Sequence, residues 1–162
     1  MKTTARDILR DKGGHMVSIS SEGTIYQALT LMTQNKVGSV VVVDNDKIVG
    51  IWTERDLMFR VLEEGFDPKK ALLKDNMSEQ LISVNINEQA YQMYDKFLGR
   101  RIRHLLVEED GQYIGILSVG DVVRAQLHQL NEDYQELNQK VSLEYYENWK
   151  DIQNERRRPG NT

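Results

Sequence analysis

The chain has 162 residues, of which 40% are hydrophobic and 28% are charged, as is ordinary for a globular protein in water. It has no cysteine, which excludes disulfides, cysteine metal sites and thiol nucleophiles. No apolar run approaches the roughly 20 residues of a membrane span, no signal-peptide-like segment opens the chain, and the net charge is −4. We therefore expect a cytoplasmic protein whose main partner is neither a membrane nor nucleic acid.

The first elements follow one another over about 60 residues. The short run "VSIS" predicts a strand, and Thr24 is placed to cap a following helix. That helix carries apolar residues at i, i+3, i+4 and i+7, the buried stripe of an amphipathic helix: Ile25, Ala28, Leu29 and Met32. The runs "SVVVVD" and "KIVGI", with "DND" as a turn, predict a hairpin, and "DLMFRVL" predicts a second helix.

The same pattern returns 65 residues later. The second helical stripe is Ala90, Met93, Tyr94 and Phe97, and the second hairpin is "HLLVEE" and "QYIGI". Each copy has one apolar sheet face and two helical stripes, so we expect the copies to pack together. The predicted fold is α/β (α+β): two tandem β-α-β-β-α repeats, residues 1–68 and 69–127, paired about a pseudo-twofold axis, then a helical extension, 128–162.

Each copy contains a hydroxyl residue three positions before an aspartate, where a strand becomes a helix. The two segments are "GIWTERD", with Thr53 and Asp56, and "GILSVGD", with Ser118 and Asp121. One interpretation is a capping box, in which the hydroxyl and the acid each bond a backbone amide of the other residue. The residues that usually complete such a box are Glu and Gln, whereas both copies use Asp.

The other interpretation is a ligand site. A helix N-terminus favours phosphate, and a fixed carboxylate can accept from both hydroxyls of a ribose. Gly50 and Gly115 would let a flat base approach the backbone. The residue types leave the cap and the nucleotide site about equally supported.

Other chemistry is sparse in the sequence. The three histidines, His15, His104 and His128, lack metal-ligand spacing, and no Ser-His-acid, phosphate-loop or redox motif appears. The arginine clusters at 100–103 and 156–158 are expected to be solvated. Nucleic-acid binding through them would require a steep salt dependence. We predict a protein without catalytic activity.

The ordered set of segments resembles a tandem pair of CBS domains, the regulatory module named after cystathionine β-synthase. The resemblance covers about residues 4 to 127 and is carried by "ARDIL" and "LKDNM", by "VSISSEGTIYQALTLMTQNKVGSVVVVD", by "ISVNINEQAYQMYDKFLGRRIRHLLVEEDG" and by the two G-I-x-[ST]-x-x-D segments. Repeat two departs from many relatives in having "RHLLV", without a proline after the His-Leu pair.

The resemblance implies two clefts that commonly bind adenine nucleotides, each built from both repeats. The first cleft would join Thr53 and Asp56 to Ser83, Ile102, Arg103 and His104. The second cleft would join Ser118 and Asp121 to Ser18, Val37, Gly38 and Ser39. Since the Arg103 guanidinium can hold phosphate, the first cleft is expected to bind more tightly. In the second cleft, Arg124 could supply the missing cation.

The C-terminal part predicts a long helix, because residues 121–158 contain neither Gly nor Pro. An apolar heptad runs through it: Leu127, Leu130, Tyr134, Leu137 and Val141. Tyr145, Trp149 and Ile152 continue the stripe with a drift in register. The helix could fold back over its own domain, but we favour one that joins two chains, and the final "RRRPGNT" is expected to be frayed.

These features predict a regulatory sensor, without a required cofactor, that binds AMP, ADP, ATP or a dinucleotide such as NAD(H). Ligand would stabilise one arrangement of a homodimer and so signal to an unidentified downstream protein. The alternative is an interaction or scaffold protein with degenerate clefts that dimerises through the C-terminal helix.

Overall fold

The structure, a computed structural model, describes residues 3–14 and 16–156. His15 and the residues after Arg156, where fraying is expected, lie outside the described part of the chain, as do the side chains of Trp149 and Ile152.

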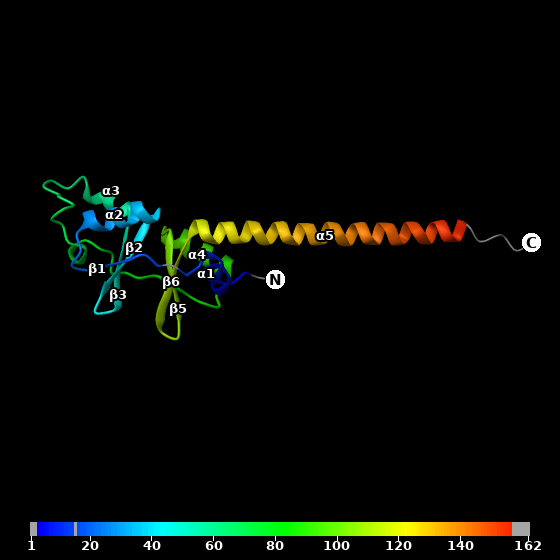
Figure 1. The fold of residues 1–162 in the computed structure, drawn as a ribbon, viewed down its shortest axis with the longest axis horizontal. Helices are drawn as coiled ribbons and strands as arrows, with labels where there is room; N and C mark the ends of the chain where they lie inside the picture. Colours follow the sequence, from blue (N-terminus) through cyan, green and yellow to red (C-terminus); the bar gives the residue numbers. More distant parts are fainter. Residues whose placement is uncertain (1–2, 15, 157–162) are drawn as a thin grey trace, which may run out of the picture. The chain divides into compact units, whose positions relative to one another are not determined.

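Both repeats have the predicted order of strand, helix, strand, strand, helix (Figure 1). Repeat one consists of β1 (Ser18–Ser20), α2 (Ile25–Asn35), β2 (Ser39–Asp44), β3 (Lys47–Thr53) and α3 (Glu54–Arg60). Repeat two consists of β4 (Ser83–Asn85), α4 (Ala90–Arg100), β5 (His104–Glu109), β6 (Gln112–Ser118) and α5 (Val119–Arg156). Helix α1 (Ala5–Lys12) precedes the first repeat, and a 3₁₀ turn, η1 (Leu73–Asp75), precedes the second.

Each repeat forms its own three-stranded sheet, in the order β1-β2-β3 and β4-β5-β6. The first pair in each sheet is parallel and the second is antiparallel. Both hairpins turn through two residues with positive φ, Asn45 and Asp46 in one and Asp110 and Gly111 in the other, as a type I′ turn requires. Both sheets also carry a bulge at matched positions, after Val42 and after Val107. The duplication therefore extends to backbone irregularities.

The central strand β2 is buried on both faces, which explains its unbroken apolar run. Val40 and Val42 pack into a core with helix α2 and the fully buried Trp52. Val41, which points the opposite way, packs with Leu106 of the other sheet. The two sheets therefore share an apolar layer.

The segments that lead into the repeats are exchanged between them. We call residues 3–12 and 68–80 the leading segments. The first pairs with repeat two through the bridge Thr4–Gln89, and α1 packs against β6. The second pairs with repeat one through the bridge Thr24–Leu72. Consequently each repeat is completed by chain that belongs, in sequence, to the other repeat.

The glycines proposed to admit a base are covered by these leading segments. The side chain of Met77 lies over Gly50, and that of Leu9 lies over Gly115. A Cβ added at Gly115 would stand 2.5 Å from Leu9 Cδ1, far inside van der Waals contact. The structure thus gives these glycines a packing role: they let the leading segments approach the sheets.

We expect Gly50→Ala to lower the free energy of unfolding by about 1 to 3 kcal/mol, because Met77 would have to move in a packed region. Gly99→Ala is the matched control. It lies in α4 with nothing within 4 Å of an added Cβ, so it should be neutral or stabilising by up to about 1 kcal/mol. Urea unfolding of both variants measures the difference, and equal stabilities would contradict this packing role.

By contacts, the chain divides into two compact units, one that ends at Val122 and one that begins at Val123. The first unit holds repeat one and the strands and α4 of repeat two, and the second unit begins inside α5. The predicted heptad is exposed: Leu127, Leu130, Tyr134, Leu137 and Val141 are each 56–66% accessible. None of the helices in the described residues is both long and apolar enough to cross a bilayer.

Candidate functional site

Both hydroxyl–aspartate pairs form complete capping boxes. In the first, the backbone N–H and the hydroxyl of Thr53 donate to Asp56 Oδ2 at 2.8 and 2.7 Å. The Asp56 amide donates back to Thr53 Oγ1 at 3.3 Å. Ser118 and Asp121 make the same three bonds at 2.8, 2.8 and 3.2 Å. The shorter aspartate therefore does reach the cap amide.

A third box of the same kind begins α1, where it had not been noticed in the sequence. The amide and hydroxyl of Thr4 donate to Asp7 Oδ2 at 3.0 and 2.6 Å, and the Asp7 amide donates to Thr4 Oγ1 at 3.4 Å. The bonds lower the pKa of Asp7 below its usual value, the side-chain bond from Thr4 most of all. Since "TARD" shows the motif without the preceding glycine and strand, hydroxyl-x-x-Asp by itself indicates a cap.

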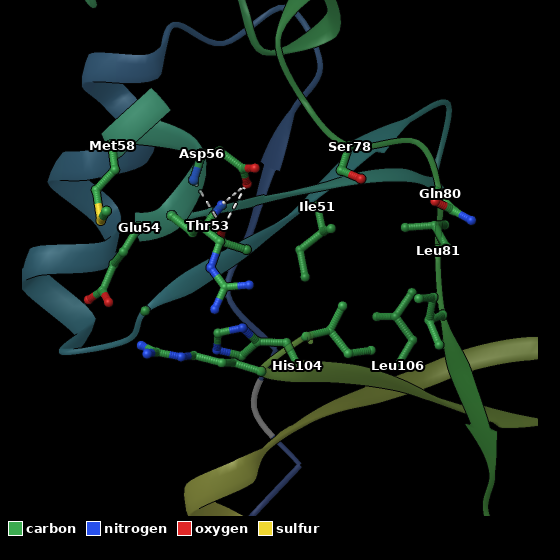
Figure 2. A pocket seen from close by; sticks show the side chains of 15 residues that line it. Ile51, Thr53, Glu54, Asp56, Met58, Ser78, Gln80, Leu81, His104 and Leu106 are labelled. Carbon is green, nitrogen blue, oxygen red and sulfur yellow. Dashed lines mark hydrogen bonds between the residues drawn. The ribbon is translucent and has the colours of Figure 1, made fainter. Parts of the chain in front are cut away.

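A cavity of about 410 Å³ lies beside the Thr53–Asp56 box. The start of α3 forms one wall, the leading segment with Ser78, Gln80 and Leu81 lies opposite, and His104 and Leu106 of β5 close a third side (Figure 2). The complete lining is Gly38, Ile51, Thr53, Glu54, Arg55, Asp56, Met58, Ser78, Gln80, Leu81, Ile82, Ile102, Arg103, His104 and Leu106. Both repeats contribute residues to this lining, so the cavity lies between the two repeats.

Most residues assigned to the first cleft line this cavity: Thr53, Asp56, Ile102, Arg103 and His104. Ser83 is not among the lining residues. Its hydroxyl donates to Glu108 at 3.1 Å, and the neighbouring Ile82 faces the cavity instead. Gly38, assigned to the second cleft, also lines the first, because it precedes β2 and its carbonyl accepts from the Glu54 amide at 3.1 Å.

The residues assigned to the second cleft are differently placed. Ser18 is exposed on β1, where it pairs with Val41 of β2, and Ser39 is buried beside Thr53. Val37 packs on the core around Trp52. Ser118 and Asp121 remain together at the start of α5, and Arg124 follows in the other compact unit.

Asp121 has a partner that the sequence did not suggest. Lys12 Nζ donates to Asp121 Oδ2 at 2.8 Å and to the Ile116 carbonyl at 2.9 Å. Burial raises the pKa of Asp121, but the bonds from Lys12 and Ser118 together outweigh it and hold the pKa below its usual value. The carboxylate is therefore ionised and paired with an ammonium group.

His104 is neutral at physiological pH. Burial lowers its pKa to about 4, and the positive charges of Lys12 and Arg103 act in the same direction, against the opposing effect of Asp121. A neutral imidazole can both donate and accept a hydrogen bond and offers a flat face to a bound ring. Together with exposed Arg103 it gives the cavity one uncharged polar group and one cation from the same strand end.

The half-buried His104 predicts a dependence of stability on pH. Its folded pKa of about 4 lies below the usual 6.5, so between these values the unfolded chain binds more protons. The free energy of unfolding of the wild type should therefore fall as pH decreases from 6.5 to 4, by about 3 kcal/mol at most from this group. In His104→Gln this part of the pH dependence should vanish.

Exposed His128→Gln serves as the control and should follow the wild type. Unfolding by urea at pH 4 to 7 measures all three proteins. Parallel curves for the wild type and His104→Gln would contradict the assignment.

Two tandem sheet-and-helix repeats with a cavity between them define a paired-repeat binding module. The family model for the CBS domain matches residues 5–63 and 71–128. The chain is 34% identical over 152 residues to the CBS domain-containing protein CBSX3, mitochondrial, of Arabidopsis thaliana. The aligned region covers 88% of this chain and 74% of that protein.

Two solved structures show the same fold. The crystal structure of a CBS-domain-containing protein of Agrobacterium tumefaciens has a TM-score of 0.74 and 35% identity, covering 78% of this chain and 95% of that one. A CBS-domain pair in complex with 5′-methylthioadenosine and S-adenosyl-L-methionine has a TM-score of 0.69 and 21% identity. The match covers 80% of this chain and 99% of that one. The chain belongs to the CBS-domain family, whose members are generally regulatory and bind ligands.

Proposed function

We propose that this protein is a non-catalytic sensor that binds an adenine nucleotide in the first cleft. The observation that carries the proposal is the cavity of about 410 Å³, whose lining includes Asp56, Arg103 and His104. Neither capping box alone would support it, because the box at Thr4 and Asp7 has the same geometry.

The cavity offers separate groups for the separate parts of a nucleotide. The hydroxyl and the backbone amide of Thr53 both donate to Oδ2 of Asp56. Among the described residues no partner is found for the other carboxylate oxygen, Oδ1, which can therefore accept from ribose hydroxyls. Arg103 can hold phosphate, and apolar Ile51, Leu81 and Leu106 can enclose a base. The cap and the ligand site are therefore compatible functions of one carboxylate.

The ligand class is AMP, ADP, ATP or NAD(H). A protein of this fold, 21% identical to this chain, holds two adenosine compounds, so the fold can accommodate an adenosine group. Since the lining contains both cations (Arg55, Arg103) and acids (Glu54, Asp56), charge alone does not select the number of phosphates. The lack of cysteine suits a reducing compartment, and we place the protein in the cytoplasm.

Signalling would require the ligand to change an assembly. The exposed heptad on α5 from Leu127 to Val141 has the 3, 4, 3, 4 spacing of a coiled coil, so we propose that a second copy of the chain covers it. A ligand that binds one arrangement of the dimer more tightly shifts the population towards it, and a downstream protein would respond to that arrangement.

Isothermal titration calorimetry with AMP, ADP, ATP and NAD(H) tests the proposal. At least one should bind stoichiometrically, and its affinity should exceed that of the matching guanine compound. If none binds, the second candidate function gains support, a scaffold that acts through α5. The observation favouring that alternative is the extent of apolar surface exposed on α5.

A further inference from the structure

The two leading segments occupy equivalent places on opposite repeats. Leu9 covers Gly115 as Met77 covers Gly50. The bridges Thr4–Gln89 and Thr24–Leu72 are likewise related by the repeat. Three residues after Leu9 and Met77 come Lys12 and Gln80, so these two occupy matched positions in the sequence.

Lys12 and Gln80 make different contacts. In repeat one, Ile51 exchanges two backbone hydrogen bonds with Ser78, both 3.0 Å long, and Gln80 lines the open cavity. In repeat two, the carbonyl of Ile116, the counterpart of Ile51, accepts instead from Lys12 Nζ at 2.9 Å. The same ammonium group reaches Asp121 Oδ2 at 2.8 Å.

Lys12 thus binds the carboxylate that corresponds to Asp56, which is one of the residues assigned to the second cleft. The pair is half-buried, with side chains 28% and 15% accessible for Lys12 and Asp121. A ribose hydroxyl is neutral. If it replaced the ammonium group of Lys12 at Asp121, both Lys12 and Asp121 would lose the opposite charge that compensates them in this half-buried position.

We propose that Lys12 determines the specificity of the second cleft by holding Asp121 and so excluding a ribose, which leaves one nucleotide site per chain. This inference rests on the proposed function, since it assigns to Asp121 the role that Asp56 has in the first cleft. It also accounts for the different residues at positions 12 and 80: the polar, uncharged Gln80 leaves the first cleft open.

The test is calorimetric titration of the full chain with AMP. The wild type should bind one AMP per chain, and Lys12→Gln, which introduces the residue of the matched position, should bind two. In the Asp56→Ala background, the affinity for AMP should fall about a hundredfold with Lys12 present, and Lys12→Gln should restore tight binding at one AMP per chain. Lys12→Ala provides a second opening variant, and thermal unfolding establishes that each protein is folded.

The outcomes separate this inference from the proposed function. Two AMP per wild-type chain, or one per chain in both folded Lys12 variants, would overturn the role of Lys12 while leaving the first cleft intact. A wild type that binds none, with one AMP bound by Lys12→Gln, would support the role of Lys12 and overturn the assignment of the first cleft. If none of the proteins binds AMP, ADP, ATP or NAD(H), both the role of Lys12 and the proposed function are overturned.

Discussion

Replacing Asp56 by alanine is expected to weaken nucleotide binding about a hundredfold, which corresponds to about 3 kcal/mol. The variant removes the carboxylate that we assign to the ribose, and hydrogen bonds to a charged acceptor each contribute about 1.5 to 3 kcal/mol. It also removes the capping box of α3, at a cost of about 1 kcal/mol in stability. Calorimetry with AMP measures the affinity, and urea unfolding measures the stability.

Asp7→Ala is the matched control for the loss of a cap. Asp7 makes the same three bonds with Thr4 at the start of α1 but does not line the cavity. Both variants should lose similar stability, while only Asp56→Ala should lose affinity. If the two variants bind AMP as tightly as the wild type, Asp56 is a cap and nothing more.

Introducing glutamate at Leu130 and Leu137 together is expected to convert the proposed dimer into monomers. These residues are seven positions apart on α5 and are 66% and 58% exposed in the single chain, so a coiled coil would bury them at the same heptad position. Four carboxylates would then face one another in an apolar seam, at a cost that exceeds the stability of a short coiled coil. Light scattering coupled to size-exclusion chromatography measures the mass.

The control places the same two charges away from the seam. Gln135→Glu together with Gln139→Glu alters exposed positions outside the stripe and should leave the dimer intact. The affinity of the first cleft for AMP should change little in either double variant, because the cavity lies within the unit that ends at Val122. A monomeric wild type, or a dimer that persists in Leu130→Glu/Leu137→Glu, would refute the assignment of α5.

Several local features of the first repeat could be predicted from the sequence. The apolar stripe from Ile25 to Met32, the cap at Thr24 and the turn at Asn45 and Asp46 are all found where the sequence predicts them. Each depends on residues within a few positions of one another, so helix and strand periodicity suffices to predict it. Gly50 shows the limit, because its neighbour Met77 approaches from another part of the chain.

The sequence by itself therefore determined the duplication, the order of elements in each repeat and the apolar stripe of α5, since these follow from spacing along the chain, but it left the two hydroxyl–aspartate pairs open between a cap and a ligand site. Only the tertiary structure decided which of three equivalent caps borders a cavity and which is held by an ammonium group. Lys12 and Asp121 are 109 residues apart in sequence, and the exchange of the leading segments brings them together. Long-range contacts of this kind leave no periodic signal in the chain, and they make the surroundings of Asp56 and Asp121 different.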